Sequence, residues 1–231
     1  MSLGRGAAHG AAWNLMTAVG ERGLGFIVLA ILIRHVTLRD VGVVAIASAL
    51  SEIGRMVTTG GSGEQVIASP GDRSVEAGAF WAQMLLALAM SAALFAAAPL
   101  LAMAYDARPI AWVTRALSVN IVIGAFLIVP SARLAQRFGF RALSLMSLGS
   151  TSLGGVVALA LVFTGHGLAA LIAQRIVGIT FYAVAASITA RWRPPAFPSW
   201  RVIGDAMRFN IPMMGAAFVD YTSVISGMTL L

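Results

Sequence analysis

Apolar runs of about 20 residues recur along the whole of this chain and decide what it can fold into. A helix of about 20 apolar residues crosses the roughly 30 Å hydrocarbon core of a membrane. Of the 231 residues, 59% are hydrophobic and only 11% are charged. The sequence therefore predicts an all-α integral membrane protein, with a six-helix transmembrane bundle followed by the start of a seventh helix.

Turn and loop residues divide the apolar runs into helices. The predicted helices span residues 12–33, 41–68, 75–103, 110–129, 142–163 and 168–190, and a seventh segment begins near residue 202. Residues 1–190 then form the bundle, 191–201 form a cytoplasmic linker rich in Pro, Arg and Trp, and 202–231 form the first helix of a truncated second bundle. We expect truncation because the sequence stops at GMTLL with no flanking charge.

Glycine, proline and tryptophan mark local features of these helices. The glycines at 60–63 predict irregular backbone near the end of the second helix. Pro130 is predicted to end the fourth helix, and residues 131–141 to form a short amphipathic segment at the membrane surface. The aromatic belts at the membrane surface are predicted to hold Trp13, Trp81, Trp192 and Trp200.

Charge sets the expected orientation. All 16 basic residues are Arg, and the net charge is +7. The arginines are scattered over loops and helices, so we expect no nucleic-acid partner. An N-terminus in the cytoplasm places nine loop arginines inside and three outside, which follows the positive-inside rule.

Enzymatic chemistry has little support in the sequence. A hydrolase or metal enzyme needs a cluster of nucleophile, base or ligand residues. His9, His35 and His166 each fall at a helix end or turn, far apart along the chain. The absence of Cys excludes disulfides and thiolate metal sites. We therefore expect a protein that is not an enzyme, with no catalytic residues, no metal and no cofactor.

The most unusual polar stretch lies in the second predicted helix, inside SALSEIGRMVTTGGS. At about 100° per residue, its polar residues fall on one narrow stripe: Ser48, Glu52, Arg55, Thr59 and Ser62. A charged pair at membrane depth is costly and by default indicates a functional site. The three-residue spacing also allows Glu52 and Arg55 to neutralise each other as a structural pair, and that alternative stays open.

Other predicted helices carry interior charges as well. Over the first six helices four arginines outnumber two glutamates, and this net charge of +2 suits an anionic substrate. The arginine fork matches phosphate because it binds two oxygens at once. The candidate substrate-binding residues are Arg115, Arg175, Arg55 and Arg22, of which the first two have no acidic neighbour on their own helices. The candidates for coupling or for lining the cavity are Glu21, Glu52, Asp220, Asn14 and Thr59.

Three stretches resemble one family of membrane proteins. ILIRHVTLRDVGVVAIASAL is similar to the first loop of polysaccharide flippases. In that family an Arg ends the first helix, and an acidic residue, an aromatic residue and a Gly follow in the loop. Arg34, Asp40 and Gly42 match this pattern, and Val41 takes the place of the aromatic residue. PSARLAQRFGFRALS resembles the connection between the fourth and fifth helices of these proteins. GHGLAALIAQRIVG resembles the turn between the fifth and sixth helices, and RWRPPAFPSWR resembles the linker before the seventh. The family is the Wzx-type lipopolysaccharide (O-antigen) or exopolysaccharide flippases of the multidrug/oligosaccharidyl-lipid/polysaccharide exporter superfamily.

The resemblance implies a longer transporter with two helical bundles around a central cavity, of which this chain holds the N-terminal half. It implies flipping of undecaprenyl-diphosphate-linked oligosaccharide across the bacterial inner membrane for polysaccharide biosynthesis. The implied partners are the lipid-linked oligosaccharide, membrane lipids, the polysaccharide assembly machinery, and either the missing C-terminal half or a second copy of the chain.

Two other functions stay open. A cation-coupled multidrug exporter of the same superfamily would need a net acidic cavity to hold cationic drugs, whereas these interior charges are net basic. A non-transporting membrane assembly protein of the polysaccharide machinery would have interior arginines that are all paired, with none facing a solvated cavity.

Overall fold

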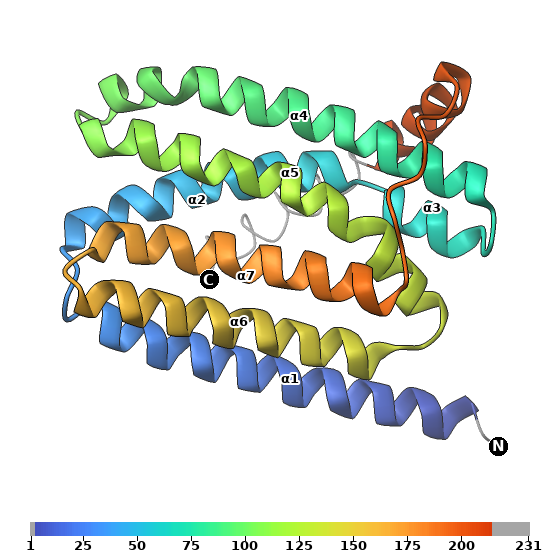
Figure 1. The fold of residues 1–231 in the computed structure, drawn as a ribbon, viewed down its shortest axis with the longest axis horizontal. Helices are drawn as coiled ribbons and strands as arrows, with labels where there is room; N and C mark the ends of the chain where they lie inside the picture. Colours follow the sequence, from blue (N-terminus) through green and yellow to red (C-terminus); the bar gives the residue numbers. More distant parts are fainter. Residues whose placement is uncertain (1–2, 214–231) are drawn as a thin grey trace, which may run out of the picture.

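The structure, a computed structural model, describes the backbone of residues 3–213 and the side chains of residues 17–213 (Figure 1). The described helices are α1 (Leu3–Leu32), α2 (Leu38–Thr59), α3 (Ser62–Ala68), α4 (Arg73–Ala104), α5 (Arg108–Gln136), α6 (Phe140–Phe163) and α7 (Gly167–Thr189), followed by a helix at 200–213. With α2 and α3 taken as one span, five of the helices searched are long and apolar enough to cross a membrane. The predicted class, an all-α integral membrane protein, is confirmed.

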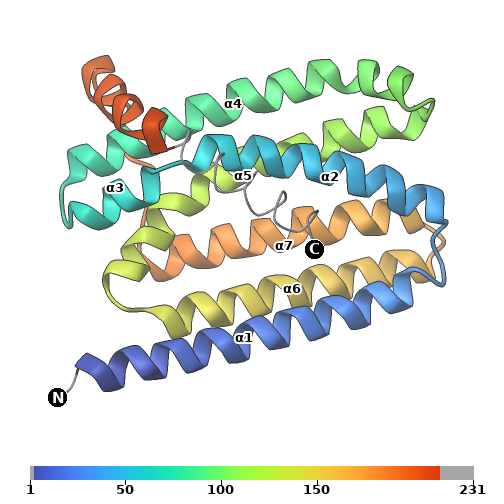
Figure 2. The same cartoon turned by 180° about the vertical axis from the view of Figure 1, so that it is seen from behind.

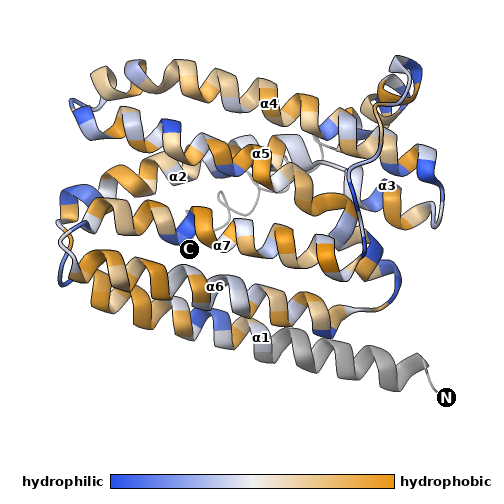
Figure 3. Cartoon of the chain, viewed as in Figure 1, coloured by the Kyte–Doolittle hydropathy of each residue, from blue (hydrophilic) through white to orange (hydrophobic). Residues whose placement is uncertain are grey.

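α5 is the central helix of the bundle. It packs against α4 and α2 on one side and against α7 on the other, while α6 packs against both α7 and α1. Figures 1 and 2 show the resulting order α4, α5, α7, α6 and α1, with α2 beside α5 and apart from α1 over most of its length. Figure 3 shows apolar residues over most of each long helix and hydrophilic residues gathered mainly in the loops. This distribution is typical of helices that face lipid.

The second span breaks at its glycines, as predicted. α2 ends at Thr59, and α3 begins at Ser62. Gly61 has a φ of +76°, in the left-handed region that favours glycine. A Cβ at Gly61 would also lie 2.8 Å from the Cβ of Met213, so the turn is closely covered by the helix at 200–213.

The prediction that Pro130 ends its helix is wrong. α5 continues to Gln136, so residues 131–136 belong to a partly buried helix end and not to a separate surface segment. A proline removes one backbone hydrogen bond, and contacts with neighbouring helices compensate for the loss inside a membrane. Here Arg133 pairs with Glu76 of α4, and Gln136 Nε2 donates to the carbonyl oxygen of Val66 over 2.6 Å.

Glycine lets α6 and α7 lie close together. A Cβ on Gly154 of α6 would fall against the carbonyl oxygen of Gln174 of α7, closer than real Cβ atoms come. Across the same interface, the Ser150 hydroxyl donates to the carbonyl oxygen of Gly178 over 2.7 Å. The backbones of these two helices therefore touch with no side chain between them.

Gly154→Ala is expected to lower the stability of the purified protein, because α6 and α7 must separate to admit the methyl group. We expect a loss of about 1–3 kcal/mol, the usual cost of overpacking. The matched control is Gly42→Ala in α2, where the added Cβ meets nothing within 4 Å and the helix gains slightly from alanine. Thermal unfolding in detergent measures both, and equal melting temperatures would contradict the close contact at Gly154.

Aromatic side chains hold residues 190–199, the segment between α7 and the helix at 200–213, against α4. The Trp81 Nε1 donates to the carbonyl oxygen of Pro195 over 3.1 Å, and its ring lies edge-on against Phe80. Trp192 is only 5% exposed and packs against the same Phe80. The prediction of a membrane-belt position for Trp192 is therefore wrong, because the chain after α7 folds back over α4 and carries this ring into the core.

The helix at 200–213 packs on the same bundle. Val202 lies against Gly78 of α4, where a Cβ would be 2.9 Å from the Val202 Cγ1. Asn210 Nδ2 donates to the buried Ser62 Oγ over 2.6 Å. The described part of the predicted seventh segment is thus held against α3 and α4.

Candidate functional site

The candidate site contains an ion pair at the middle of the second span. Glu52 and Arg55 lie near the centre of the segment Leu38–Ala68. Arg55 Nε donates to Glu52 Oε2 over 3.1 Å, and Arg55 Nη2 donates to Glu52 Oε1. The side chains keep 38% (Arg55) and 60% (Glu52) of their surface exposed. The pairing allowed by their spacing is therefore present, but it leaves both groups accessible to a further charged partner.

A glycine on the neighbouring helix makes room for Arg55. A Cβ on Gly124 of α5 would lie 3.3 Å from both Cγ and Cδ of Arg55. The apolar stem of the arginine therefore lies against the α5 backbone, and its charged end reaches Glu52. Gly124 thus helps to fix the position of the pair.

Arg175 on α7 adds a second guanidinium to the pair. α2 and α7 pack against each other, and the charge of Arg175 interacts with that of Glu52. Arg175 forms no ion pair of its own with any residue of the described part of the chain. The carboxylate of Glu52 therefore pairs with Arg55 and also interacts electrostatically with Arg175, and we call these three residues the central cluster. Its balance is one positive charge.

Glu21 extends the polar region to α1. This residue is partly buried, and its charge interacts with the Tyr182 hydroxyl of α7. Tyr182 follows Arg175 by seven residues and so lies on the same face of α7, two turns away. Arg22, the next residue on α1, is exposed. Tyr182 was not among the predicted site residues, although its spacing from Arg175 is the signal that indicates it.

Arg115 is not part of the central cluster. Its guanidinium carbon lies 5.0 Å from the centre of the Phe95 ring of α4. Arg115 precedes Gly124 by nine residues, which at about 100° per residue places the two on opposite faces of α5. Because Gly124 faces Arg55, Arg115 points away from the cluster.

The remaining predicted residues lie elsewhere or outside the described residues. The Thr59 hydroxyl donates to the carbonyl oxygen of Met56 over 3.2 Å, within its own helix. The side chain of Asn14 and all of Asp220 fall outside the described residues, so their roles stay predictions.

The predicted polar stripe of α2 does not face one environment. Ser48 and Ser62 are 8% and 0% exposed, whereas the Glu52 side chain is 60% exposed.

Among residues 17–213, no group of three His, Asp or Glu side chains is placed to bind a metal. The central cluster has instead the chemistry of an anion site, since guanidinium groups donate hydrogen bonds and accept none.

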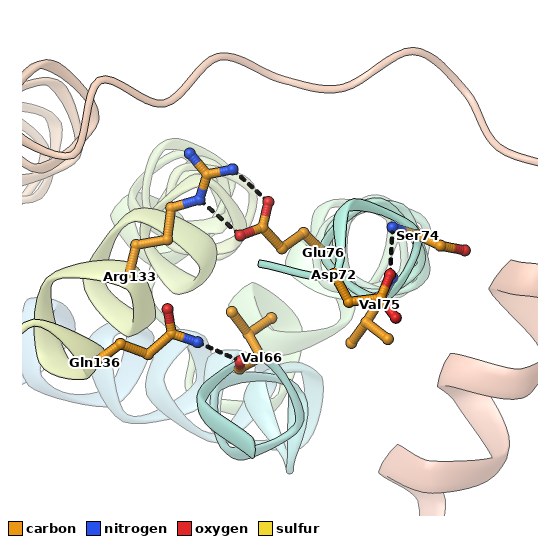
Figure 4. Close-up of polar contacts among 7 residues, drawn as sticks. All are labelled: Val66, Asp72, Ser74, Val75, Glu76, Arg133 and Gln136. Atoms are coloured by element: carbon orange, nitrogen blue, oxygen red, sulfur yellow. Dashed lines mark hydrogen bonds and ion pairs between the residues drawn. The ribbon is translucent and has the colours of Figure 1, made fainter. Parts of the chain in front are cut away.

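Sequence reasoning missed a second ion pair, between α4 and α5. Arg133 Nε donates to Glu76 Oε1 over 2.7 Å, and Arg133 Nη2 donates to Glu76 Oε2 (Figure 4). The Glu76 side chain is 8% exposed and that of Arg133 26%. Glu76 falls in the predicted helix 75–103, beside apolar Ala79 and Phe80, and this setting is a signal that its charge needs a partner. Arg133 falls in the predicted surface segment 131–141, so no local signal joins the two residues. This pair joins two helices and leaves no free charge.

The fold and the cluster define a multi-pass helical membrane protein with arginines inside its spans. Residues 31–228 match the family described as "Polysaccharide biosynthesis protein", and the chain belongs to this family. It is 28% identical over 222 residues to the succinoglycan biosynthesis transport protein ExoT of Rhizobium meliloti (strain 1021). The resemblance to polysaccharide flippase-type proteins is confirmed.

The alignment with the succinoglycan transport protein covers 95% of this chain and 44% of that relative. The chain therefore spans less than half the length of the curated relative that it matches. No solved structure matches the chain.

Proposed function

We propose that the chain forms part of a transporter that flips undecaprenyl-diphosphate-linked oligosaccharide across the bacterial inner membrane. The observation that carries the proposal is the central cluster, in which the carboxylate of Glu52 pairs with Arg55 and interacts electrostatically with Arg175, near the middle of their spans. Charged groups at this depth occur where a polar substrate or ion passes. Membership of a polysaccharide biosynthesis family supports the substrate class.

In this proposal the arginines bind the diphosphate. Arg175 has no ion pair of its own within the described range, so its fork is free to bind two phosphate oxygens. Arg55 adds a second contact when the substrate replaces the carboxylate of Glu52. Arg22, exposed on α1, extends the positive surface toward the sugar end.

Glu52 is proposed to return the site to its resting state. When the anion leaves, the carboxylate again neutralises Arg55, so the empty site does not keep two unpaired charges in a low-dielectric region. Glu21, whose charge interacts with Tyr182, is the second proposed coupling residue. Asn14, Thr59 and Asp220 complete the proposed polar lining.

Transport is proposed to need a second helical bundle, supplied by a C-terminal half or by a second copy of the chain. The relative named for transport is more than twice as long as the aligned region. Two bundles that rock around a site at mid-membrane give alternating access. The polar headgroup would pass between them while the polyprenyl tail stays in lipid, and the assembly machinery would receive the product.

The charge balance of the central cluster disfavours the multidrug alternative. A cationic drug would meet two arginines and one carboxylate, which is net repulsion. A non-transporting assembly protein needs no guanidinium without an ion pair at mid-membrane. Arg175 therefore favours the transport proposal over both.

The proposed topology, with six spans and a cytoplasmic N-terminus, is testable because the chain has no Cys. Single cysteines at Ser69, between α3 and α4, and at Thr164, between α6 and α7, lie at opposite ends of the bundle. A membrane-impermeant maleimide added to intact cells is expected to label Thr164→Cys and to spare Ser69→Cys. The reverse pattern would contradict the orientation, and a permeabilised sample controls for reactivity.

The experiment that tests the proposed function uses the complete gene product that contains this chain. A strain with the gene deleted is expected to lose surface polysaccharide, and the complete gene is expected to restore it. Normal polysaccharide output in the deletion strain would overturn the proposal.

A further inference from the structure

A stripe of α5 that faces away from the central cluster carries two arginines and a tryptophan. Arg108, Trp112 and Arg115 follow one another at spacings of four and three residues, so they share one face. All three are exposed, and Trp112 keeps 45% of its surface open. We call these residues the outer arginine stripe.

The same face of α5 continues as an apolar surface. Val119 and Phe126 are 47% and 36% exposed, and both lie on the turns that follow Arg115. Exposed apolar side chains on a membrane-spanning helix form a surface that suits the acyl chains of lipids. Arg115 is thus an exposed arginine at the start of an apolar surface, about 10 Å along the helix from Arg108.

Within residues 17–213, neither the Arg108 nor the Arg115 guanidinium forms an ion pair with a carboxylate. Arg115 instead lies over the ring of Phe95, 5.0 Å from its centre, which steadies the cation without neutralising it. A charge left in hydrocarbon is costly, so an arginine in this position reaches for the membrane surface or for an anion.

Helix geometry aims Arg115 at the lipid headgroups. Side chains on an α-helix lean toward its N-terminus, and α5 begins at Arg108. Arg115 therefore extends back toward Arg108, past Trp112, whose amphipathic ring suits the same depth. Arg108 stands in the first turn of α5, so both guanidinium groups are directed toward the same end of this helix.

We propose that the outer arginine stripe binds the phosphate of an anionic phospholipid, with Arg108 and Arg115 as its ligands and Trp112 against its glycerol region. This lipid site lies on the face of α5 opposite Gly124 and Arg55, so it is separate from the proposed transport site. The occupant is a phospholipid because the surface below the phosphate is apolar and accepts acyl chains, which a soluble phosphate lacks.

The test is native mass spectrometry of the purified chain titrated with phosphatidylglycerol or phosphatidylcholine. We expect Arg108→Gln and Arg115→Gln each to weaken phosphatidylglycerol binding about five-fold, and the double variant about twenty-five-fold, since each arginine near an anionic surface contributes a factor of that size. Binding of phosphatidylcholine is expected to change much less. Arg115→Lys, which keeps the charge, is expected to retain most of the binding and shows that loss in Arg115→Gln is not misfolding.

The matched control is Arg137→Gln, at the opposite end of the same helix, which is expected to leave this binding unchanged. Unchanged phosphatidylglycerol affinity in the double variant would overturn the proposal. Full displacement of the lipid by inorganic phosphate would also overturn it, because the site would then recognise the free anion. Loss of a dimer peak in the double variant, with lipid binding intact, would instead assign the stripe to a contact between copies.

Discussion

Arg175→Gln in the complete transporter is expected to reduce surface polysaccharide to the level of the deletion strain. Arg175 is the guanidinium of the central cluster that has no ion pair of its own in the described structure. A charge-assisted hydrogen bond contributes about 1.5–3 kcal/mol, so its loss weakens diphosphate binding about ten- to a hundred-fold. Polysaccharide measured per cell, with the protein quantified by immunoblot, checks the result.

Graded variants separate binding from folding. Arg175→Lys keeps the charge but loses the two-pronged fork, and we expect it to restore only part of the output. Arg55→Gln is expected to reduce polysaccharide output less than Arg175→Gln, because Arg55 Nε and Nη2 already donate hydrogen bonds to Glu52. Arg137→Gln, exposed at the end of α5, serves as the control for removal of one arginine. Wild-type output from Arg175→Gln at normal protein level would remove Arg175 from the site.

Arg133→Met is expected to destabilise the protein by about 3–5 kcal/mol, because it leaves the carboxylate of Glu76 buried without its partner. Glu76→Gln is expected to cost less, since the Arg133 side chain is 26% exposed and reaches solvent or headgroups. Thermal unfolding of the purified protein in detergent measures both changes.

The double variant Glu76→Leu, Arg133→Met tests the physical reason. Replacing both members of a buried ion pair by apolar residues of similar size is often neutral. We therefore expect the double variant to be more stable than Arg133→Met alone. A double variant that loses the sum of the two single losses would show that the ion pair is not what couples these positions.

The spans could be predicted from the sequence because hydropathy and turn residues are local signals. The glycines at 60–63 marked a break that the structure confirms, since a left-handed backbone at Gly61 is a property of that residue itself. The predicted helix end at Pro130 was wrong because the effect of a proline on a helix depends on residues that are distant in the sequence. Arg133 and Gln136 hold the turns after it, and their contacts on α4 and α3 are not visible in the local sequence.

The central cluster could be predicted in part. The spacing of Glu52 and Arg55 on one helix predicts that they can meet, and they do. The approach of Arg175 depends on α7 packing against α2, which no spacing within one helix reveals. Arg115 shows the same limit, because the sequence cannot tell which face of α5 meets α2. The burial of Trp192 likewise could not be predicted from the local sequence, since it follows from the contact of the linker with Phe80 of α4.

The measurement that tests the central claim most directly locates the lipid-linked oligosaccharide in the inner membrane. Right-side-out and inside-out vesicles, prepared from wild-type and deletion cells, are treated with a membrane-impermeant reagent that oxidises sugars. We predict that in deletion cells the lipid-linked oligosaccharide reacts only in inside-out vesicles, and that in wild-type cells it reacts in both. If the lipid-linked oligosaccharide reacts as much in right-side-out vesicles of the deletion strain as in those of the wild type, the substrate crosses without this protein. That result would contradict the account.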